Sequence, residues 1–222
     1  QIRKNHGNVG IGFADDNLFV NRRFARELLF RLAGSGVRWY CLSDVSIGAD
    51  PELLLLMRES GCVNVCLGLE SVSAESLSGI ERSDWKAKQV RKYPEYVQRI
   101  QENGLGVMGA FIVGFDNDRL ETFGDIAEFI TNNNLHTSEI TFLTPLPGTR
   151  LRERLRKQGR LTSDNWEHYG FLDINFTHPN LTHSQLIDGI LSIYEKVYSP
   201  EVRAKRLQYF KDIEKELAKA AS

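Results

Sequence analysis

Five times along the chain, a short apolar run typical of a strand ends in a polar or glycine-rich cluster and then passes into an amphipathic helix. The runs are Val9–Phe13, Val37–Leu42, Val63–Leu69, Leu105–Val113 and Ser138–Leu143. Repeated strand–helix units predict a parallel sheet whose strands lie side by side, joined by right-handed crossovers. Because functional residues of such sheets gather at the carboxyl ends of the strands, the five polar clusters are predicted to form one shared site.

Capping residues predict where the helices begin. Asn21 suits the N-cap of a helix with Phe24 and Leu28 on its apolar side, and Asp50 followed by a proline is a strong helix start. The polar stretch from Ser71 to Lys88 is predicted to be a long connection. Further helices are predicted at about 93–103, 120–131 and up to about 159.

Beyond Gly159 the pattern changes. The segment from Trp166 to Phe176 is aromatic-rich and is predicted to hold one more short strand near 172–176. Thr182 then caps an amphipathic helix, and after Pro200 a charged helix is predicted. We therefore divide the chain into a barrel-forming part, residues 1–160, and a C-terminal aromatic segment with helices, residues 161–222.

Length and composition are those of a globular protein. The chain has 222 residues, 41% hydrophobic and 26% charged, which is enough for a sizeable core. A net charge of −1 gives no general attraction to nucleic acid or anionic lipid, and no apolar run approaches the roughly 20 residues that span a bilayer. The expected partner is a small-molecule substrate, with no nucleic acid and no membrane. Because the chain begins without Met or an apolar leader, we expect a fragment or a processed product.

Three cysteines, Cys41, Cys62 and Cys66, are few and odd in number, as expected in a reducing cytoplasm. Cys62 and Cys66 lie on one predicted strand, where residues four apart are about 13 Å from each other. That separation excludes a shared metal ion or a disulfide between them, so buried thiols are predicted. The five histidines show no ligand spacing on a helix face, and no metal site is predicted.

Four motifs at the strand ends carry a resemblance to a known family. They are F-A-D-D-N-L-F at 13–19, G-C leading to G-L-E-S at 61–71, G-A-F-I-V-G-F-D at 109–116 and T-P-L-P-G-T at 144–149. In this order and spacing they resemble the radical S-adenosylmethionine (SAM) superfamily. The closest likeness is to its branch often fused to a cobalamin-binding domain, which includes magnesium-protoporphyrin cyclase-like iron–sulfur oxidoreductases.

The resemblance implies an α/β fold, a partial parallel βα barrel of the radical SAM type with a C-terminal helical extension. In that family a loop with three cysteines, C-x3-C-x2-C, holds a four-iron four-sulfur cluster (4Fe-4S), and this sequence has no such triplet. The implied cofactors of a full-length protein are SAM and that cluster, with cobalamin implied through a separate domain. Either the cysteine region was removed, which we favour, or the chain is a degenerate relative. By itself the chain is expected to be inactive in SAM cleavage.

The resemblance also assigns residues of the first three strand ends. Asp15 and Asp16, with the adjacent Asn17, lie where the family contacts the methionyl amino group of SAM, and the alternative is a plain turn cap. Glu70 lies where the family hydrogen-bonds the ribose hydroxyls, and the alternative is a salt bridge at the barrel rim. Asp44 either lies near the substrate or the methionyl carboxylate, or caps a loop.

The last two strand ends are assigned to adenine. Gly109 and Gly114 lie on the strand against which the family packs adenine, and the alternative is a bulge or close barrel packing. Thr144 and Pro145 place backbone groups near adenine, and a proline-rich turn is the alternative. Catalytic residues are not identified.

Three functions stay open on the sequence. The first is the C-terminal part of a radical SAM oxidoreductase or methyltransferase, contributing SAM- and substrate-binding strands. The second is a cluster-free barrel enzyme with Asp16 or Glu70 as base, and the third is a non-catalytic binding module. In the first case the sheet edge at Val9–Phe13 lacks its neighbouring strand, so self-association through that edge is predicted.

Overall fold

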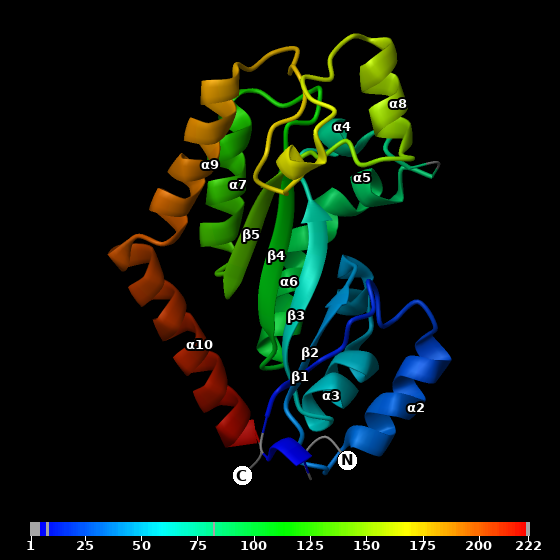
Figure 1. Ribbon diagram of the computed structural model, residues 1–222. Coiled ribbons are helices and arrows are strands. Elements are labelled where there is room, and N and C mark those ends of the chain that lie inside the picture. The colour runs from blue at the N-terminus through cyan, green and yellow to red at the C-terminus, as the bar shows by residue number, and fades with distance from the viewer. Residues whose placement is uncertain (1–4, 8, 82, 221–222) are drawn as a thin grey trace.

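Five parallel strands form one sheet in the order β1-β2-β3-β4-β5. The computed structural model describes residues 5–7, 9–81 and 83–220. The strands are β1 (Ile11–Gly12), β2 (Trp39–Ser43), β3 (Cys62–Glu70), β4 (Gly106–Val113) and β5 (Thr137–Phe142). All four neighbouring pairs are parallel. The curved sheet and its helices form a half-barrel, which confirms the predicted fold class (Figure 1).

The helices that connect the strands are α2 (Arg22–Leu32), α3 (Pro51–Glu59), α6 (Tyr93–Glu102) and α7 (Leu120–Asn132). Two predicted caps are confirmed. The side chain of Asn21 accepts a hydrogen bond from the amide of Phe24, and that of Asp50 accepts from the amide of Leu53. These bonds satisfy amides that the first turn of a helix leaves free.

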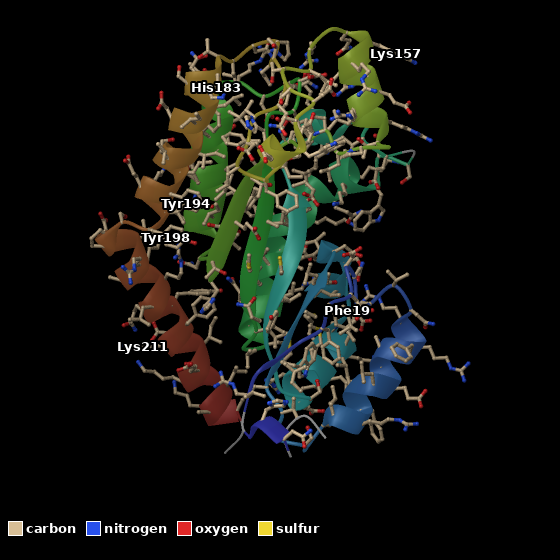
Figure 2. The ribbon with its side chains drawn as sticks, in the orientation of Figure 1. Phe19, Lys157, His183, Tyr194, Tyr198 and Lys211 are labelled. Atoms are coloured by element: carbon tan, nitrogen blue, oxygen red, sulfur yellow. The ribbon has the colours of Figure 1, made fainter. Side chains whose placement is uncertain are left out.

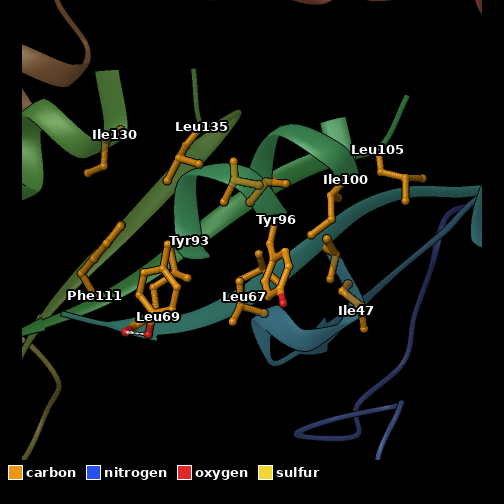
Figure 3. Close-up of a cluster of buried hydrophobic side chains, with 14 of the residues drawn as sticks. Ile47, Leu67, Leu69, Tyr93, Tyr96, Ile100, Leu105, Phe111, Ile130 and Leu135 are labelled. Atoms are coloured by element: carbon orange, nitrogen blue, oxygen red, sulfur yellow. Dashed lines mark hydrogen bonds between the residues drawn. The ribbon is translucent and has the colours of Figure 1, made fainter. Parts of the chain in front are cut away.

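The strands bury one face and leave the other partly open. Along β3, Leu67 and Leu69 are fully buried, whereas the alternate residues Cys66 and Glu70 are partly exposed. Successive side chains of a strand point to opposite faces, so the buried set faces the helices. Figure 3 shows this core, in which the hydroxyl of Tyr93 from α6 donates to the carbonyl oxygen of Leu69 over 3.1 Å. The inner face of the half-barrel is partly exposed.

One predicted connection contains short helices, and one predicted strand is wrong. The polar stretch from 71 to 88 contains two short helices, α4 (Ala74–Leu77) and α5 (Trp85–Gln89), and a 3-10 turn, η2 (Val90–Lys92), follows. The hydroxyl of Ser73 caps α4, a local signal that the polarity of the stretch obscured. The strand predicted near 172–176 does not form in the described part of the chain, where a single antiparallel bridge joins Leu161 to Phe176.

The C-terminal part contains α8 (Arg150–Lys157), a 3-10 turn η3 (Trp166–His168), α9 (His183–Val197) and α10 (Pro200–Ala220). Thr182 caps α9, as predicted, and the structure adds a reciprocal capping box with Gln185. From the end of α9, α10 runs along the sheet toward the amino ends of the strands (Figure 1). Among the helices of the described ranges, none is long and apolar enough to cross a membrane.

Tyr194 of α9 and Tyr198, the C-cap of that helix, cover the free edge of β5. The backbone amides of Ser138 and Ile140 donate to the hydroxyls of Tyr198 and Tyr194, over 3.1 and 3.2 Å. Figure 2 labels both tyrosines near the end of α9. Their rings are stacked with centroids 5.9 Å apart. Unpaired amides at a sheet edge invite pairing with another chain, and these hydroxyls satisfy two of them.

Candidate functional site

At the ends of β1 and β2, two of the predicted site residues meet. The side-chain amide of Asn17 donates to the carboxylate of Asp44 over 2.7 Å. Asp44 also caps the following 3-10 turn, η1 (Val45–Ala49), so its loop-capping alternative is part of the structure. Asp15 and Asp16 are exposed beside this pair, and in the described part of the chain neither makes a hydrogen bond or an ion pair through its carboxylate. Both carboxylates are therefore open to a ligand.

Glu70, the last residue of β3, has an unusual backbone conformation. Its φ is +64°, in the left-handed region that residues other than glycine rarely adopt. The register between β3 and β4 shifts between Gly68 and Glu70, as at a β-bulge. The Glu70 Oε1 lies 2.6 Å from the ammonium of Lys86, which comes from α5. Such backbone conformations cost about 1 to 3 kcal/mol and cluster at functional sites.

Lys86 is a candidate site residue that the sequence analysis missed. It lies in the stretch predicted to be a connection, where nothing in the pattern separates it from other charged residues. The side chains of Lys86 and Glu70 are 29% and 23% exposed, so their ion pair is partly shielded from water and still reachable. The pair offers a ligand one charged hydrogen-bond acceptor, the Glu70 carboxylate, and one cationic donor, the Lys86 ammonium.

A cavity of about 290 Å³ joins the ends of three strands. Glu70 comes from β3, Ile112 from β4, and Leu143 follows β5, while Phe115 and Lys86 complete much of the wall. The lining is largely apolar with a few charged groups, which is typical of small-molecule sites. A second cavity, of about 350 Å³, shares Phe115 and Leu143 with the first.

Asp118, which the sequence analysis did not select, holds the loop after β4. Its Oδ2 accepts from the amides of Gly114 and Phe115 over 2.8 and 3.0 Å, and its Oδ1 accepts from the hydroxyl of Ser76 over 2.8 Å. Burial raises the pKa of Asp118, while these hydrogen bonds act against the shift. Gly114 has a φ of +106°, which favours glycine, so the shape of this loop alone accounts for that residue.

His178 fixes the same loop from the C-terminal part. Its Nδ1 accepts from the amides of Asn180 and Leu181 over 3.1 and 3.0 Å. The proton is therefore assigned to Nε2, which donates to the carbonyl oxygen of Phe115 over 2.7 Å. The loop is thus held between Asp118 on one side and His178 on the other.

Asp116, in the same loop, is bound by two arginines. Arg154 of α8 and Arg160 each place a guanidinium nitrogen 2.7 Å from its carboxylate. Burial alone would raise the pKa of Asp116, but the hydrogen bonds and charges of Arg160 and Arg154 hold it below the ordinary value. The carboxylate therefore joins the loop to α8.

The last strand end is fixed by a buried arginine. The hydroxyl of Thr144 donates to a carbonyl oxygen at the end of β5, and the carbonyl oxygen of Pro145 accepts from Arg152 over 3.2 Å. The Arg152 guanidinium lies 5.1 and 5.0 Å from the ring centroids of Trp166 and Tyr169 and also donates to the Tyr169 hydroxyl. The aromatic segment is thereby packed onto the T-P-L-P-G-T loop.

Gly109 faces the helices and the core. A Cβ at this position would lie 2.7 Å from Leu135 and 2.8 Å from Phe111, both of which are buried. Close packing therefore accounts for this glycine, as the alternative proposed. A backbone contact of this strand with adenine stays a prediction.

The cysteines of this chain do not fit an iron–sulfur cluster. Burial raises the pKa of the Cys66 thiol to about 11, and Glu139 and Glu70 add to the shift, so the thiol is protonated at neutral pH. A hydrogen bond to Cys62, together with burial, raises the pKa of Cys41. Within the described ranges, no group of three or more His, Cys, Asp or Glu side chains is placed to hold a metal ion.

Sequence comparison identifies relatives that have methyltransferase and cyclase names. The family described as "Domain of unknown function (DUF4070)" matches residues 149–221. Bacteriochlorophyllide d C-12(1)-methyltransferase of Chlorobaculum tepidum is 27% identical over 94% of this chain and 44% of its own length. The anaerobic magnesium-protoporphyrin IX monomethyl ester cyclase of Cereibacter sphaeroides is 27% identical over 89% of this chain and 33% of its own length.

Structural comparison finds the same fold in a radical SAM methyltransferase. TsrM from Kitasatospora setae, solved with cobalamin and a [4Fe-4S] cluster bound, has a TM-score of 0.71 at 15% identity, covering 89% of this chain and 44% of TsrM. The fold is therefore that of a radical SAM partial barrel. The chain spans less than half the length of the relatives named here.

The ordered strand-end motifs, the partial barrel and the named relatives together confirm the resemblance to the radical SAM superfamily. Within that superfamily, the relatives confirm the resemblance to the cobalamin-associated branch that includes the magnesium-protoporphyrin cyclases.

Proposed function

We propose that this chain contributes the SAM- and substrate-binding strands of a radical SAM methyltransferase or oxidoreductase. The observation that carries the proposal is Glu70, a strained and ion-paired carboxylate in a cavity formed by three strand ends. The family resemblance predicts ribose contact at this position, and a carboxylate accepts from both ribose hydroxyls.

The chemistry of the strand-end residues fits SAM. Glu70 would accept from the ribose, and the open carboxylates of Asp15 and Asp16 would bind the ammonium of the methionyl group. Lys86 would bind the methionyl carboxylate, and the apolar wall around Ile112 would face adenine. When bound, SAM supplies either a methyl group for transfer or the radical chemistry of the superfamily. The work of these residues is to bind and orient it and to exclude water.

The substrate would bind the inner face of the half-barrel. Tyr40 and Leu42, alternate residues of β2, are 51% and 38% exposed, and the exposed Glu139 of β5 adds a carboxylate. An apolar substrate with a hydroxyl or cationic group suits this combination. We further propose that the cluster ligands and any cobalamin site belong to residues outside this sequence, so that the chain alone is inactive in SAM cleavage.

Saturation-transfer NMR with SAM tests the proposal on the chain itself. We expect saturation of the protein to be transferred to the adenine and ribose protons of SAM. Glu70→Gln removes one charged hydrogen-bond acceptor and should weaken SAM binding about tenfold, as a loss of about 1.4 kcal/mol does. Lys86→Met should also weaken binding, whereas Glu195→Gln, an exposed position on α9, should not.

The thermal unfolding midpoint of each variant serves as the folding control. Absence of saturation transfer from the folded wild-type chain would contradict the proposal. So would equal SAM affinities of the wild type and Glu70→Gln.

A further inference from the structure

A cavity of about 800 Å³ lies at the amino ends of the strands, at the opposite end of the sheet from Glu70. One wall consists of residues at the starts of the strands, among them Arg38, Val63 and His136. The other wall is α10, which contributes Arg203, Arg206, Leu207 and Phe210. These four positions have the i, i+3, i+4, i+7 spacing of a single helix face, so α10 presents two arginines and two apolar residues to the cavity.

The arginines of this cavity exceed the acidic residues. Three guanidinium groups line it, from Arg38, Arg203 and Arg206, and Glu214 is the one acidic residue of the lining. In the described part of the chain, none of the three arginines forms an ion pair. Arg38 and Arg203 are exposed, so an anion can reach both from solvent.

Arg206 supplies an independent reason to expect anion binding. It is only 7% exposed, and its Nε is buried with no acceptor in the described residues. One terminal nitrogen donates to the carbonyl oxygen of Val197 over 3.0 Å, and the guanidinium lies 5.6 Å from the ring centroid of Tyr198. Neither contact neutralises the charge. Burial and the neighbouring Arg203 lower the pKa of Arg206, although Tyr198 opposes the shift.

The rest of the wall suits an apolar body on the ligand. Leu207 is 58% exposed and Val63 is 36% exposed, both at the cavity. The Phe210 ring lies edge-on to the His136 ring, with 5.5 Å between centroids. A volume of about 800 Å³ is within the range of sites for small organic molecules.

His136 adds a neutral donor. Burial, followed by the charge of Arg206, lowers the pKa of His136, so the ring is neutral at pH 7. Its Nδ1 lies 3.2 Å from the side-chain amide nitrogen of Asn64 and accepts from it. The ring proton is therefore assigned to Nε2, which is a hydrogen-bond donor.

We propose that this cavity is a second ligand site, which binds an organic anion with a phosphate or carboxylate group on an apolar, ring-sized body. Arg38, Arg203 and Arg206 would bind the anionic group, and Val63, Leu207 and Phe210 would contact the body. The site is separate from the strand-end residues of the proposed function and does not depend on it.

Equilibrium dialysis of the chain with 1-naphthyl phosphate, 1-naphthol and inorganic phosphate tests both parts of the site. We expect saturable binding of naphthyl phosphate, at least fivefold tighter than that of either simpler probe. Arg38→Gln and Arg203→Gln should each weaken it at least fivefold, because both arginines are exposed and can be changed without burying an unpaired group. Arg23→Gln, at an exposed arginine of α2, is the matched control and should have no effect.

Four results would overturn the proposal. One is the absence of saturable naphthyl phosphate binding by the folded chain, and another is binding that Arg38→Gln and Arg203→Gln leave unchanged. The third is displacement of naphthyl phosphate by SAM, which would assign the probe to the strand-end cavity instead. The fourth is inorganic phosphate binding as tightly as naphthyl phosphate, which would contradict a contribution of the apolar residues to binding. Retention of SAM binding with loss of probe binding in Arg203→Gln would show that the two sites are distinct.

Discussion

At the scale of single residues, the rim of the half-barrel has carboxylates in two different environments. Glu70 is partly exposed, strained and paired with a lysine, and it lines a cavity. Asp118 is 1% exposed and accepts three hydrogen bonds from the loop it supports and from Ser76. These contacts make Asp118 a positioning residue for the loop, whereas Glu70 is placed to meet a ligand.

The role of Asp118 predicts a loss of stability on truncation. Asp118→Ala leaves the amides of Gly114 and Phe115 and the hydroxyl of Ser76 without their acceptor. Each buried unsatisfied group costs about 1 to 3 kcal/mol, and removal of a buried charge offsets part of the sum. We expect a decrease of about 2 to 4 kcal/mol in the free energy of unfolding, measured by urea denaturation. An unchanged free energy would contradict the role.

Asp118→Asn provides the pH test of the same position. The pKa of Asp118 is raised in the folded chain, so its contribution to stability is full below the unfolded pKa and is lost as pH rises through the folded pKa. The asparagine variant lacks this titration. Its free energy of unfolding should therefore rise relative to that of the wild type between about pH 3 and pH 7. If the difference in free energy of unfolding between Asp118→Asn and the wild type did not change with pH over this range, the raised pKa of Asp118 would be contradicted.

Residue-level prediction from the sequence succeeded where the partner is close in the chain. Asn21, Asp50 and Thr182 cap helices within three residues of themselves, so the local pattern was enough. Lys86 and Asp118 were missed because each reaches a group on another element, Glu70 in the one case and Ser76 in the other. Such partners are fixed by tertiary packing, and spacing along the chain does not encode them.

At the scale of elements, β5 depends on α9 for its free edge. Two tyrosine hydroxyls, one turn apart at the end of α9, replace the neighbouring strand that the amides of β5 lack. The strands themselves were predicted within a few residues, because their apolar runs are continuous. The edge arrangement was not predicted, since Tyr194 and Tyr198 look like ordinary residues of an amphipathic helix.

This arrangement predicts an additive loss on removal of the hydroxyls. Tyr194→Phe and Tyr198→Phe should each lower the free energy of unfolding by about 0.5 to 1.5 kcal/mol, because each leaves one backbone amide of β5 without an acceptor. Tyr40→Phe is the matched control, since the Tyr40 side chain is 51% exposed and makes no hydrogen bond in the described part of the chain. Urea denaturation measures the free energy of unfolding of the two single variants, the double variant and the control. Equal stability of the double variant and the control would rule out the capping role.

At the scale of the whole molecule, the two edges of the sheet differ. The β5 edge is covered by α9, whereas β1, at the other edge, has β2 as its only neighbour among the strands of the described residues. The amides of Ile11 and Phe13 donate to the carbonyl oxygens of Arg38 and Tyr40. The backbone amides of the alternate residues of this strand therefore point away from β2. The half-barrel is therefore asymmetric, with one edge satisfied and one available for pairing.

The open β1 edge predicts association that depends on concentration. The weight-average mass of the chain, measured by static light scattering, should rise above 25.3 kDa as concentration increases. Gly10→Lys places a charge beside the edge, at a position where a Cβ meets nothing within 4 Å, and should reduce that rise. Gly124→Lys on α7 has the same open surroundings and changes the net charge equally, so it should leave the rise unchanged. A monomeric wild-type chain at all concentrations would refute pairing through β1, and an equal effect of the two lysines would assign the association to charge alone.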